Sequence, residues 1–304
     1  SQGLSDLLES HGHIVDWYRK SSDKIGNSLY MKIAAFFLGI YNPKAVRELK
    51  SKIKQFKPDV IQVQNVYPFI SPAILQMIKR LHIPVVMRCP NYRLFCPTGL
   101  HLDKKDEVCE KCLDGLKEFN AVLKNCEKNR FKSIGYALRN FFGRTIWGLY
   151  RNVDRYIVQS NFQKNKFIQN GIPKEKIFVV PGLTPSLYNF SLNKNPKYVS
   201  FIGRISPEKG ILEFLSCAKE LPQIPFVVIG EITQELQYLK NVSSKNVDWI
   251  GFQSGEKLDQ WFQDSRIVVV PSKWYEGFPN VITQAMKHSR PVITSNLGAM
   301  ASII

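Results

Sequence analysis

The residues best suited to do chemistry lie near the C-terminal end of the chain, in the segment 274–280, which reads Trp-Tyr-Glu-Gly-Phe-Pro-Asn. The apolar run 266–272 before it predicts a buried strand that ends at Pro271 and Ser272. A helix is predicted to begin near Asn280. Backbone N–H groups at a helix start bind phosphate, and the Glu276 carboxylate can accept hydrogen bonds from sugar hydroxyls. The segment therefore indicates a site for an anion that carries hydroxyl groups.

A second segment, 203–210, supplies cations that match such an anion. A strand is predicted to end at Gly203, and Arg204 and Lys209 flank the start of the next helix. Arg204 presents a fork of donors and Lys209 a point charge, so together they can stabilise a diphosphate without a metal ion. The simpler alternatives are a pair of surface cations, and a helix-start carboxylate at Glu276 that stabilises the macrodipole.

Taken together, the two segments resemble the family 4, or "group 1", glycosyltransferases. That family carries a G-R-x4-K-G segment and an E-G-F-P-N segment, the latter within an E-x7-E motif, and here they stand about 70 residues apart in the same order. The resemblance covers nearly the whole chain, because the N-terminal half is similar to the acceptor-side domain of such enzymes. It implies retaining transfer of a hexose from a nucleoside-diphosphate sugar, with no metal in catalysis.

The resemblance also assigns roles to individual residues. Arg204 and Lys209 would stabilise the leaving diphosphate, and Glu276 would contact the donor sugar; these three are the expected catalytic residues. The second acid of the E-x7-E motif, which grips the ribose hydroxyls, is replaced by Gln284, a neutral group that can still accept a hydrogen bond. The expected donor-binding residues are Gly203, Gly277, Phe278, Pro279, Asn280 and Gln284.

The acceptor side departs further from the family. Pro90 stands where the family often has a catalytic-site His, and a proline offers no side-chain or backbone donor. Asn91, Tyr92 and Arg93 are the candidate acceptor-side residues that follow, although packing accounts equally well for Tyr92. The two departures, Pro90 and Gln284, leave open a non-catalytic relative that binds a sugar or nucleotide.

The fold class predicted from the whole chain is α/β, because strands and helices alternate throughout. Two Rossmann-like domains are expected, facing each other across a cleft as in the GT-B architecture of the resembling family. The N-terminal acceptor-side domain is placed at 1–182, with a Cys-rich insertion at 94–130. The C-terminal nucleotide-sugar domain is placed at 183–304, joined by a polar linker at 183–197, and the chain is read as a fragment at both ends. The expected strands are 13–18, 58–65, 84–88, 156–160, 177–181, 198–203, 225–230, 247–251, 267–271 and 291–295.

Four cysteines gather in the insertion, at Cys96, Cys109, Cys112 and Cys126. Their C-x12-C-x2-C-x13-C spacing fits a closed tetrahedral zinc site that would order a long loop. Two disulfides are the first alternative, disfavoured in a cytosolic enzyme, and free thiols are the second. A structural zinc is the only cofactor that the sequence predicts.

Net charge is +17 and is placed unevenly along the chain. Residues 1–182 hold 30 Lys and Arg against 15 Asp and Glu, whereas residues 183–304 hold 12 against 10. A basic N-terminal half indicates an anionic lipid, nucleic acid or charged glycan as partner, or else an ordinary solvated surface. No nucleic-acid-binding module is recognisable, so nucleic acid is not expected as a partner.

Residues 130–153 carry five basic residues and no acid. At 100° per residue, one face gathers the apolar side chains and is expected to be core. The other side carries Tyr136, Trp147 and Tyr150 near Lys132 and Arg139, and it could lie on an anionic membrane. The apolar face consists of Phe131, Ile134, Leu138, Phe141, Phe142, Ile146, Leu149 and Val153.

From the sequence we therefore expect a transferase that acts on a glycan or lipid-linked acceptor in cell-surface polysaccharide or glycoconjugate synthesis. Its expected location is cytoplasmic, with peripheral contact at the inner face of the plasma membrane. No run of about eighteen apolar residues predicts a membrane helix. A sucrose- or trehalose-type synthase on the same fold is the alternative within the enzymes.

Overall fold

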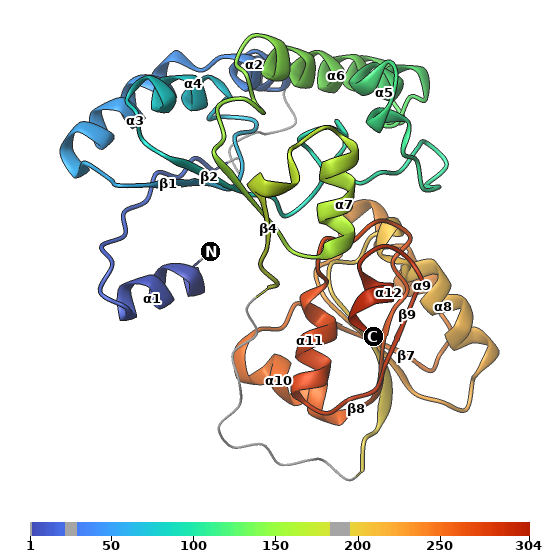
Figure 1. Ribbon diagram of the computed structural model, residues 1–304. Coiled ribbons are helices and arrows are strands. Elements are labelled where there is room, and N and C mark those ends of the chain that lie inside the picture. Colours follow the sequence, from blue (N-terminus) through green and yellow to red (C-terminus); the bar gives the residue numbers. More distant parts are fainter. Residues whose placement is uncertain (1, 22–28, 183–194) are drawn as a thin grey trace. The chain divides into compact units, whose positions relative to one another are not determined.

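A computed structural model describes residues 2–21, 29–182 and 195–304. The chain divides into two compact units, one built from Ser1–Lys105 and Cys109–Pro181, the other from Gly182–Ile304 and Asp106–Val108. We call them unit 1 and unit 2 and describe each by itself (Figure 1). The domain boundary after residue 182 stays a prediction, since most of the expected linker, 183–194, lies outside the described residues.

Unit 1 is built on a four-stranded parallel sheet in the order β1-β2-β3-β4. Helices α2, α3, α4 and α6 lie together on one side of this sheet (Figure 1), and α7 packs against β3 and β4. The strands are β1 Ile61–Val63, β2 Val85–Arg88, β3 Arg155–Val158 and β4 Ile177–Val179. The helices are α1 Gln2–Ser10, α2 Leu29–Ile40, α3 Pro43–Phe56, α4 Ala73–Arg80, α5 Asn120–Leu123, α6 Arg130–Thr145 and α7 Asn161–Gln169, with 3-10 turns at Lys111–Leu113, Lys117–Phe119 and Lys174–Lys176.

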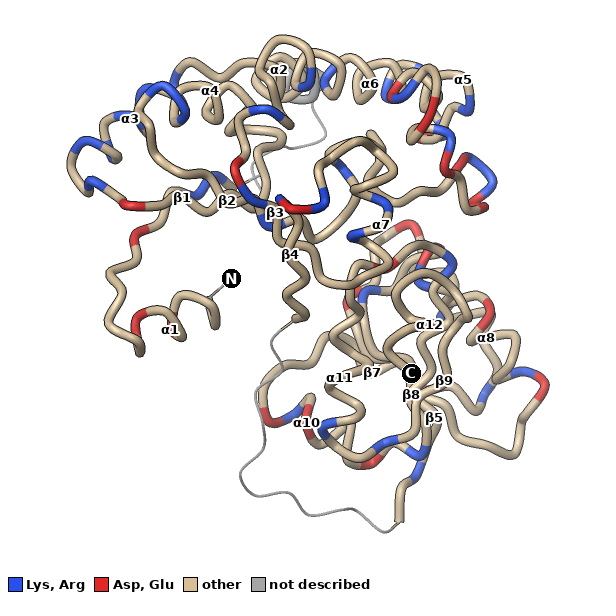
Figure 2. The backbone as a smooth tube through the Cα atoms, in the orientation of Figure 1, with Lys and Arg blue, Asp and Glu red and all other residues tan. Residues whose placement is uncertain are grey.

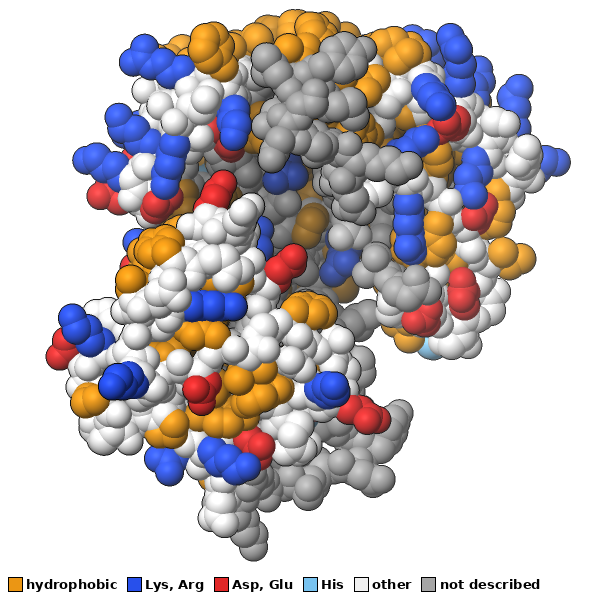
Figure 3. All heavy atoms as spheres, turned by 180° about the vertical axis from the view of Figure 1, so that it is seen from behind, with side chains coloured by type: hydrophobic (Ala, Val, Ile, Leu, Met, Phe, Trp, Pro, Cys, Tyr) orange, Lys and Arg blue, Asp and Glu red, His pale blue; other side chains and the backbone are white. Residues whose placement is uncertain are grey.

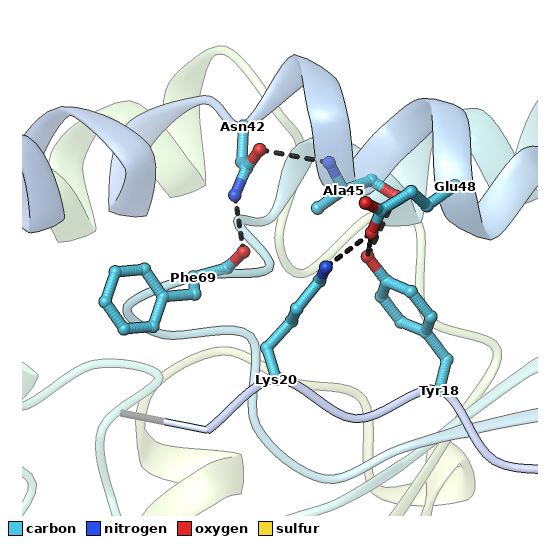
Figure 4. Close-up of polar contacts among 6 residues, drawn as sticks. All are labelled: Tyr18, Lys20, Asn42, Ala45, Glu48 and Phe69. Carbon is cyan, nitrogen blue, oxygen red and sulfur yellow. Dashed lines mark hydrogen bonds and ion pairs between the residues drawn. The ribbon is translucent and has the colours of Figure 1, made fainter. Parts of the chain in front are cut away.

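The start of α3 shows how a single side chain fixes a junction in unit 1. Asn42 is the N-cap: its Oδ1 accepts from Ala45 N at 3.0 Å, and Pro43 follows at the first helical position. Its Nδ2 donates to Phe69 O at 2.6 Å (Figure 4). Its backbone N–H donates to Ser71 Oγ. Asn42 thus joins α3 to the loop that follows β1.

The strand expected at 13–18 is wrong. Residues 13–20 have no regular secondary structure, and Ile14 is 85% exposed. Instead, side chains hold the segment along α3: Tyr18 and Lys20 both donate to the Glu48 carboxylate (Figure 4). So short a run does not distinguish a strand from an extended segment.

The orientation expected for residues 130–153 is also wrong in part. The helix ends at Thr145, because the chain turns through Gly148 at a φ of +57°. Leu149 and Val153 are buried as expected, but Phe131 is 87% exposed. Arg139, expected on the open side, is buried between the rings of Tyr67 and Tyr136 at 4.2 and 4.5 Å. The inward face of α6 is therefore polar.

Unit 2 is a five-stranded parallel sheet in the order β7-β6-β5-β8-β9. The strands are β5 Tyr198–Ile202, β6 Phe226–Ile229, β7 Val247–Gly251, β8 Ser265–Val270 and β9 Val292–Thr294. The helices are α8 Ile211–Glu220, α9 Leu239–Val242, α10 Gly255–Asp264, α11 Asn280–Lys287 and α12 Met300–Ile303, with 3-10 turns at Pro207–Lys209 and Gln234–Leu236.

Apolar clusters cover both faces of the sheet in unit 2. On one face Phe201 of β5 and Phe226 of β6 pack with Phe214 of α8. On the other face Val268 of β8 packs with Phe262 of α10 and with Ile282 of α11. Helices on both faces of a parallel sheet make the doubly wound layering that the alternation of elements predicts.

Charge and hydropathy add two observations to this architecture. Lys and Arg residues are spread over the helices of unit 1 (Figure 2). Within the described ranges, none of the helices is both long and apolar enough to span a bilayer.

The Asn42 junction generates a prediction about stability. Asn42→Ala removes the cap of α3 and the bond to Phe69 O, so the free energy of unfolding should fall by about 1–2 kcal/mol. Urea unfolding followed by circular dichroism measures the change. Asn241→Ala, at an exposed position of α9, is the matched control and should change stability by less than about 0.5 kcal/mol. Equal effects of the two substitutions would show that Asn42 does not hold the junction.

Candidate functional site

The two segments singled out in the sequence meet at the switch point of the unit 2 sheet. From β5 the sheet extends through β6 to β7 at one edge, and β8 then pairs with the other side of β5. Gly203 and Arg204 follow the carboxyl end of β5, and Pro271 and Ser272 follow the carboxyl end of β8. Ligands of open α/β sheets bind at such a switch point, beyond the carboxyl ends of the strands.

An ion pair between Lys209 and Glu276 joins the two segments. Lys209 Nζ lies 2.6 Å from Glu276 Oε1. Ser272 Oγ donates to the same oxygen at 2.8 Å, and Trp274 Nε1 donates to it at 3.0 Å. Glu276 is 5% exposed, so this carboxylate is buried with a cation and two neutral donors around it. A buried carboxylate needs such partners to remain ionised.

The backbone brings the two segments close enough for this pair to form. Gly210 adopts a φ of +77°, and a Cβ there would stand 2.0 Å from Pro271 O. Only glycine tolerates both the left-handed conformation and that approach. Lys273 N donates to Glu208 O at 2.9 Å, a second backbone tie between the segments. The glycine directly after Lys209 thus has a structural reason, because it lets the two segments approach each other.

Arg204 lies at the same edge of the sheet but makes a different pair. Its guanidinium contacts Glu208 Oε1 at 2.5 Å, and its side chain is 58% exposed. An exposed pair of this kind contributes little to stability and is easily exchanged for another anion. A ligand can therefore bind Arg204 by displacing its solvent-exposed contact with Glu208.

The loop 277–280 carries the chain from Glu276 into α11. Gly277 and Pro279 are buried, Phe278 is half-buried and Asn280 is exposed. Pro279 holds the N-cap position of α11 and has no side-chain acceptor for the first N–H groups of the helix. The half-buried Gln284 lies on this helix, one turn beyond Asn280. That these residues bind a donor stays a prediction.

The acceptor-side candidates lie in unit 1, in the loop after β2. Asn91 Oδ1 accepts from Arg93 N at 3.0 Å, which shapes the turn, and Gln163 Nε2 holds Cys89 O at 2.8 Å. Tyr92 has no exposed surface and packs edge-on against His101 at 4.8 Å between ring centroids. Burial favours the packing alternative for Tyr92, whereas Arg93 keeps part of its surface.

The four cysteines of the insertion are all free thiols, and two of them are paired by a hydrogen bond. That bond from Cys112 holds the pKa of Cys96 well below its usual range, while it raises the pKa of Cys112. Burial raises the pKa of Cys126 to about 12. Among the residues that the structure describes, no three or more His, Cys, Asp or Glu side chains are grouped to hold a metal ion. The four-thiolate zinc site stays a prediction.

Three residues of the site are not identified by the sequence reasoning. Ser272 and Trp274 orient Glu276, and Glu208 pairs with Arg204. The sequence marks Ser272 only as the end of a strand, although its place four residues before Glu276, across a turn, is a signal that points to the carboxylate. Trp274 carries no comparable signal, since an indole N–H donor is indistinguishable in sequence from a packing side chain.

Comparison with known proteins finds a family match in unit 2. Residues 188–304 match the family model described as glycosyl transferases group 1. The chain is 27% identical to an uncharacterised 42.6 kDa protein in the cps region of Klebsiella pneumoniae, over 90% of this chain and 66% of the relative. It is 23% identical to the alpha-galactosylglucosyldiacylglycerol synthase of Streptococcus pneumoniae, over 54% of this chain and 50% of that protein. The chain thus spans less than two thirds of each.

Solved structures similar to the chain fix the fold. Sucrose-phosphate synthase from Thermosynechococcus elongatus aligns with a TM-score of 0.63 and 18% identity, over 86% of this chain and 62% of that one. HepE of Anabaena, in complex with UDP and glucose, aligns with a TM-score of 0.55 and 18% identity, over 99% of this chain and 72% of that one. Both likenesses show the fold alone, which is GT-B with two Rossmann-like domains. The predicted fold class is confirmed.

The close approach at Gly210 generates a prediction that separates backbone strain from steric clash. Gly210→Ala should lower the free energy of unfolding by about 1–2 kcal/mol for the positive φ, and further for the contact with Pro271 O. Gly251→Ala is the matched control, because Gly251 has a φ of +81° and a methyl group added there would meet nothing within 4 Å. Thermal unfolding of both variants measures the difference. A Gly210→Ala protein no less stable than Gly251→Ala would mean that the two segments do not need this approach.

Proposed function

We propose that the chain is a retaining hexosyltransferase that moves a sugar from a nucleoside-diphosphate donor to a glycan or lipid-linked acceptor, in cell-surface polysaccharide or glycoconjugate synthesis. The observation that carries the proposal is the buried Lys209–Glu276 pair at the carboxyl ends of β5 and β8. Support also comes from the group 1 glycosyltransferase match of residues 188–304 and from the similar structure that holds UDP and glucose.

The role proposed for Lys209 and Arg204 is to stabilise the leaving group. When the bond between the anomeric carbon and the phosphate oxygen breaks, its electron pair goes to the diphosphate, and negative charge builds there. An ammonium and a guanidinium at the strand ends stabilise that charge in place of a metal ion. The N–H groups at the start of α11 add a partial positive charge at the same edge of the sheet.

The role proposed for Glu276 is to orient the donor sugar. Ser272, Trp274 and Lys209 all contact Oε1, which fixes the plane of the carboxylate. None of these three bonds uses Oε2, so that oxygen can accept from sugar hydroxyls. In this proposal Gln284 contacts the ribose, with a neutral amide in place of a carboxylate and a correspondingly weaker hydrogen bond. The acceptor proton passes to the departing phosphate, because Pro90 supplies no base on the acceptor side.

A second candidate function keeps the fold and changes the acceptor. The TM-score of 0.63 with sucrose-phosphate synthase makes a synthase of the sucrose or trehalose type the runner-up among enzymes. A non-catalytic relative that binds a sugar or nucleotide is the alternative outside the enzymes, in keeping with Pro90 and Gln284. Release of sugar from the donor separates an enzyme from a binding protein, and the acceptor that speeds release separates the two enzymes.

The proposed site generates a prediction about donor use. Lys209→Ala in the full-length protein should lower the rate of UDP release from UDP-glucose by roughly a hundredfold or more, since a preorganised charge at a leaving group is worth about 3 kcal/mol. Arg204→Ala should lower it less, because Arg204 is exposed. A coupled assay for UDP measures the rate, with other nucleotide sugars in place of UDP-glucose where that donor is inactive.

Lys273→Ala is the matched control for Lys209→Ala. Lys273 stands in the same loop but pairs with Glu213 at 3.1 Å, and the partly exposed pair should be dispensable. A loss of activity as large in Lys273→Ala as in Lys209→Ala would contradict the site. So would an unchanged rate in Lys209→Ala at a donor concentration below KM.

The zinc that the cysteine spacing predicts is proposed as structural, and metal analysis tests it. Protein purified under reducing conditions should contain about one zinc per chain, and Cys112→Ser should release it. Cys217→Ser, at an exposed position on α8 of unit 2, is the control and should keep the metal. Protein without zinc would leave Cys96 and Cys112 as a hydrogen-bonded thiol pair, and the transferase proposal would be unaffected because it uses no metal.

A further inference from the structure

Helix α6 exposes part of its apolar side. Phe131 is 87%, Ile134 40% and Ile146, just past the helix end, 51% exposed. The buried positions of the same helix include Ser133, Arg139, Asn140 and Gly143. A surface helix of a globular protein normally buries its apolar side chains and exposes its polar ones. Exposed apolar side chains that gather on one surface can form an interaction site.

The inward polar side of α6 makes specific hydrogen bonds that hold the helix in this orientation. Arg139 Nη2 donates to Pro97 O at 3.1 Å and to Asn140 Oδ1 at 3.3 Å. Asn140 Nδ2 donates to Arg93 O at 2.9 Å. Ser133 Oγ donates to Asn125 Oδ1 at 3.2 Å. Turning the helix over would leave these buried groups without partners at a cost of about 1–3 kcal/mol each.

The neighbouring helix α2 extends the apolar surface. Ile33, Phe37 and Tyr41 follow one another at four-residue steps along α2 and its end, and all three are exposed. The inward side of α2 packs on α6. Tyr41 stacks on Trp147 beyond the end of α6, with 5.1 Å between ring centroids. We call the surface formed by Ile33, Phe37, Tyr41, Phe131, Ile134 and Ile146 the α2–α6 face. Figure 3 shows hydrophobic side chains gathered along this upper edge, with Lys and Arg on either side.

Basic side chains border the α2–α6 face at both ends. Near Phe131 the exposed residues include Lys124, Lys128, Arg130 and Lys132. At the other end a cavity of about 260 Å³ opens beside Tyr41 and Trp147. The lining of this cavity combines the cations Lys50 and Arg80 with apolar side chains such as Met77.

We propose that the α2–α6 face docks on a membrane whose surface carries anionic lipids. Apolar side chains in the middle would enter the headgroup and acyl boundary, with Tyr41 and Trp147 at the interface. The basic borders would meet lipid phosphates, each cation contributing about 1 kcal/mol. Charge favours this occupant over a second copy of the chain, because a two-fold contact through the same face would bring like-charged borders together.

The open surface differs in part from the one expected from the sequence. The helical pattern assigns the side with Lys132 and Arg139 to the membrane, but Arg139 is buried, and Phe131 and Ile134 of the expected core side are exposed. Docking goes beyond the proposed transferase activity, since it needs neither donor nor acceptor.

Vesicle binding by the full chain tests the apolar part of the surface. We expect co-sedimentation with vesicles that contain phosphatidylglycerol and much weaker binding to vesicles of phosphatidylcholine alone. Phe37→Ser with Phe131→Ser should weaken binding at least roughly tenfold, because two exposed aromatic side chains no longer enter the interface. Phe178→Ser with Phe252→Ser, which removes two exposed aromatics from other surfaces, is the control and should bind as the unaltered protein does. Circular dichroism confirms that all variants are folded.

The charge part is tested with Lys124→Gln and Arg130→Gln, against Lys219→Gln and Lys240→Gln in unit 2 as controls. Each border substitution should weaken binding to anionic vesicles roughly fivefold, and added salt should act in the same direction. The proposal is overturned if the unaltered protein binds neither kind of vesicle, or if the Phe37 and Phe131 variant binds as well as its control. It is also overturned if light scattering shows a dimer that the Phe37 and Phe131 variant abolishes while vesicle binding is absent.

Discussion

The carboxylate of Glu276 is the group on which the candidate site depends. A charge with 5% exposure is tolerable only when partners replace the lost water, and Lys209, Ser272 and Trp274 do so from three directions around Oε1. These partners come from both segments, so the pair can form only where the two backbones touch. The left-handed Gly210 against Pro271 O is the structural consequence of that requirement.

The same constraint explains why the two cations of the site differ in character. Lys209 is held by a buried carboxylate and is therefore preorganised, with 25% of its side chain exposed. Arg204 is mostly exposed and held by Glu208 on the same short turn. A site with one fixed and one exchangeable cation can admit a dianionic group without leaving a buried charge unpaired when it is empty. This matters in unit 2, where basic and acidic residues nearly balance, because local arrangement rather than net charge must attract an anion.

The two segments of the site can be predicted from the sequence because the features that mark them are local. Gly203 and Gly210, the apolar run before Pro271 and the helix start near Asn280 each predict an element boundary from a few neighbouring residues. Nine of the ten expected strands are present, because buried parallel strands are short apolar runs with clear ends. The strand at 13–18 is predicted wrongly because so short a run does not distinguish a strand from an extended segment. The orientation of α6 is predicted wrongly in part for another reason. Periodicity shows that a helix has two faces, but the side that is buried depends on partners such as Pro97 O and Arg93 O, which lie some forty residues away in sequence.

Within unit 1, α6 connects the proposed membrane surface to the loop that carries the acceptor-side candidates. Its outward side forms half of the α2–α6 face. Its inward side donates to Arg93 O through Asn140 and to Pro97 O through Arg139, and Tyr150 OH, shortly after the helix, donates to Leu94 O at 2.8 Å. Three backbone carbonyls of one loop are thus fixed by a single helix and the turn that follows it. A helix that is polar on the inside positions that loop by hydrogen bonds, which are directional, where an apolar contact would let it slide. The inverted helix therefore has two physical effects, a rigid acceptor-side loop and an apolar outer surface.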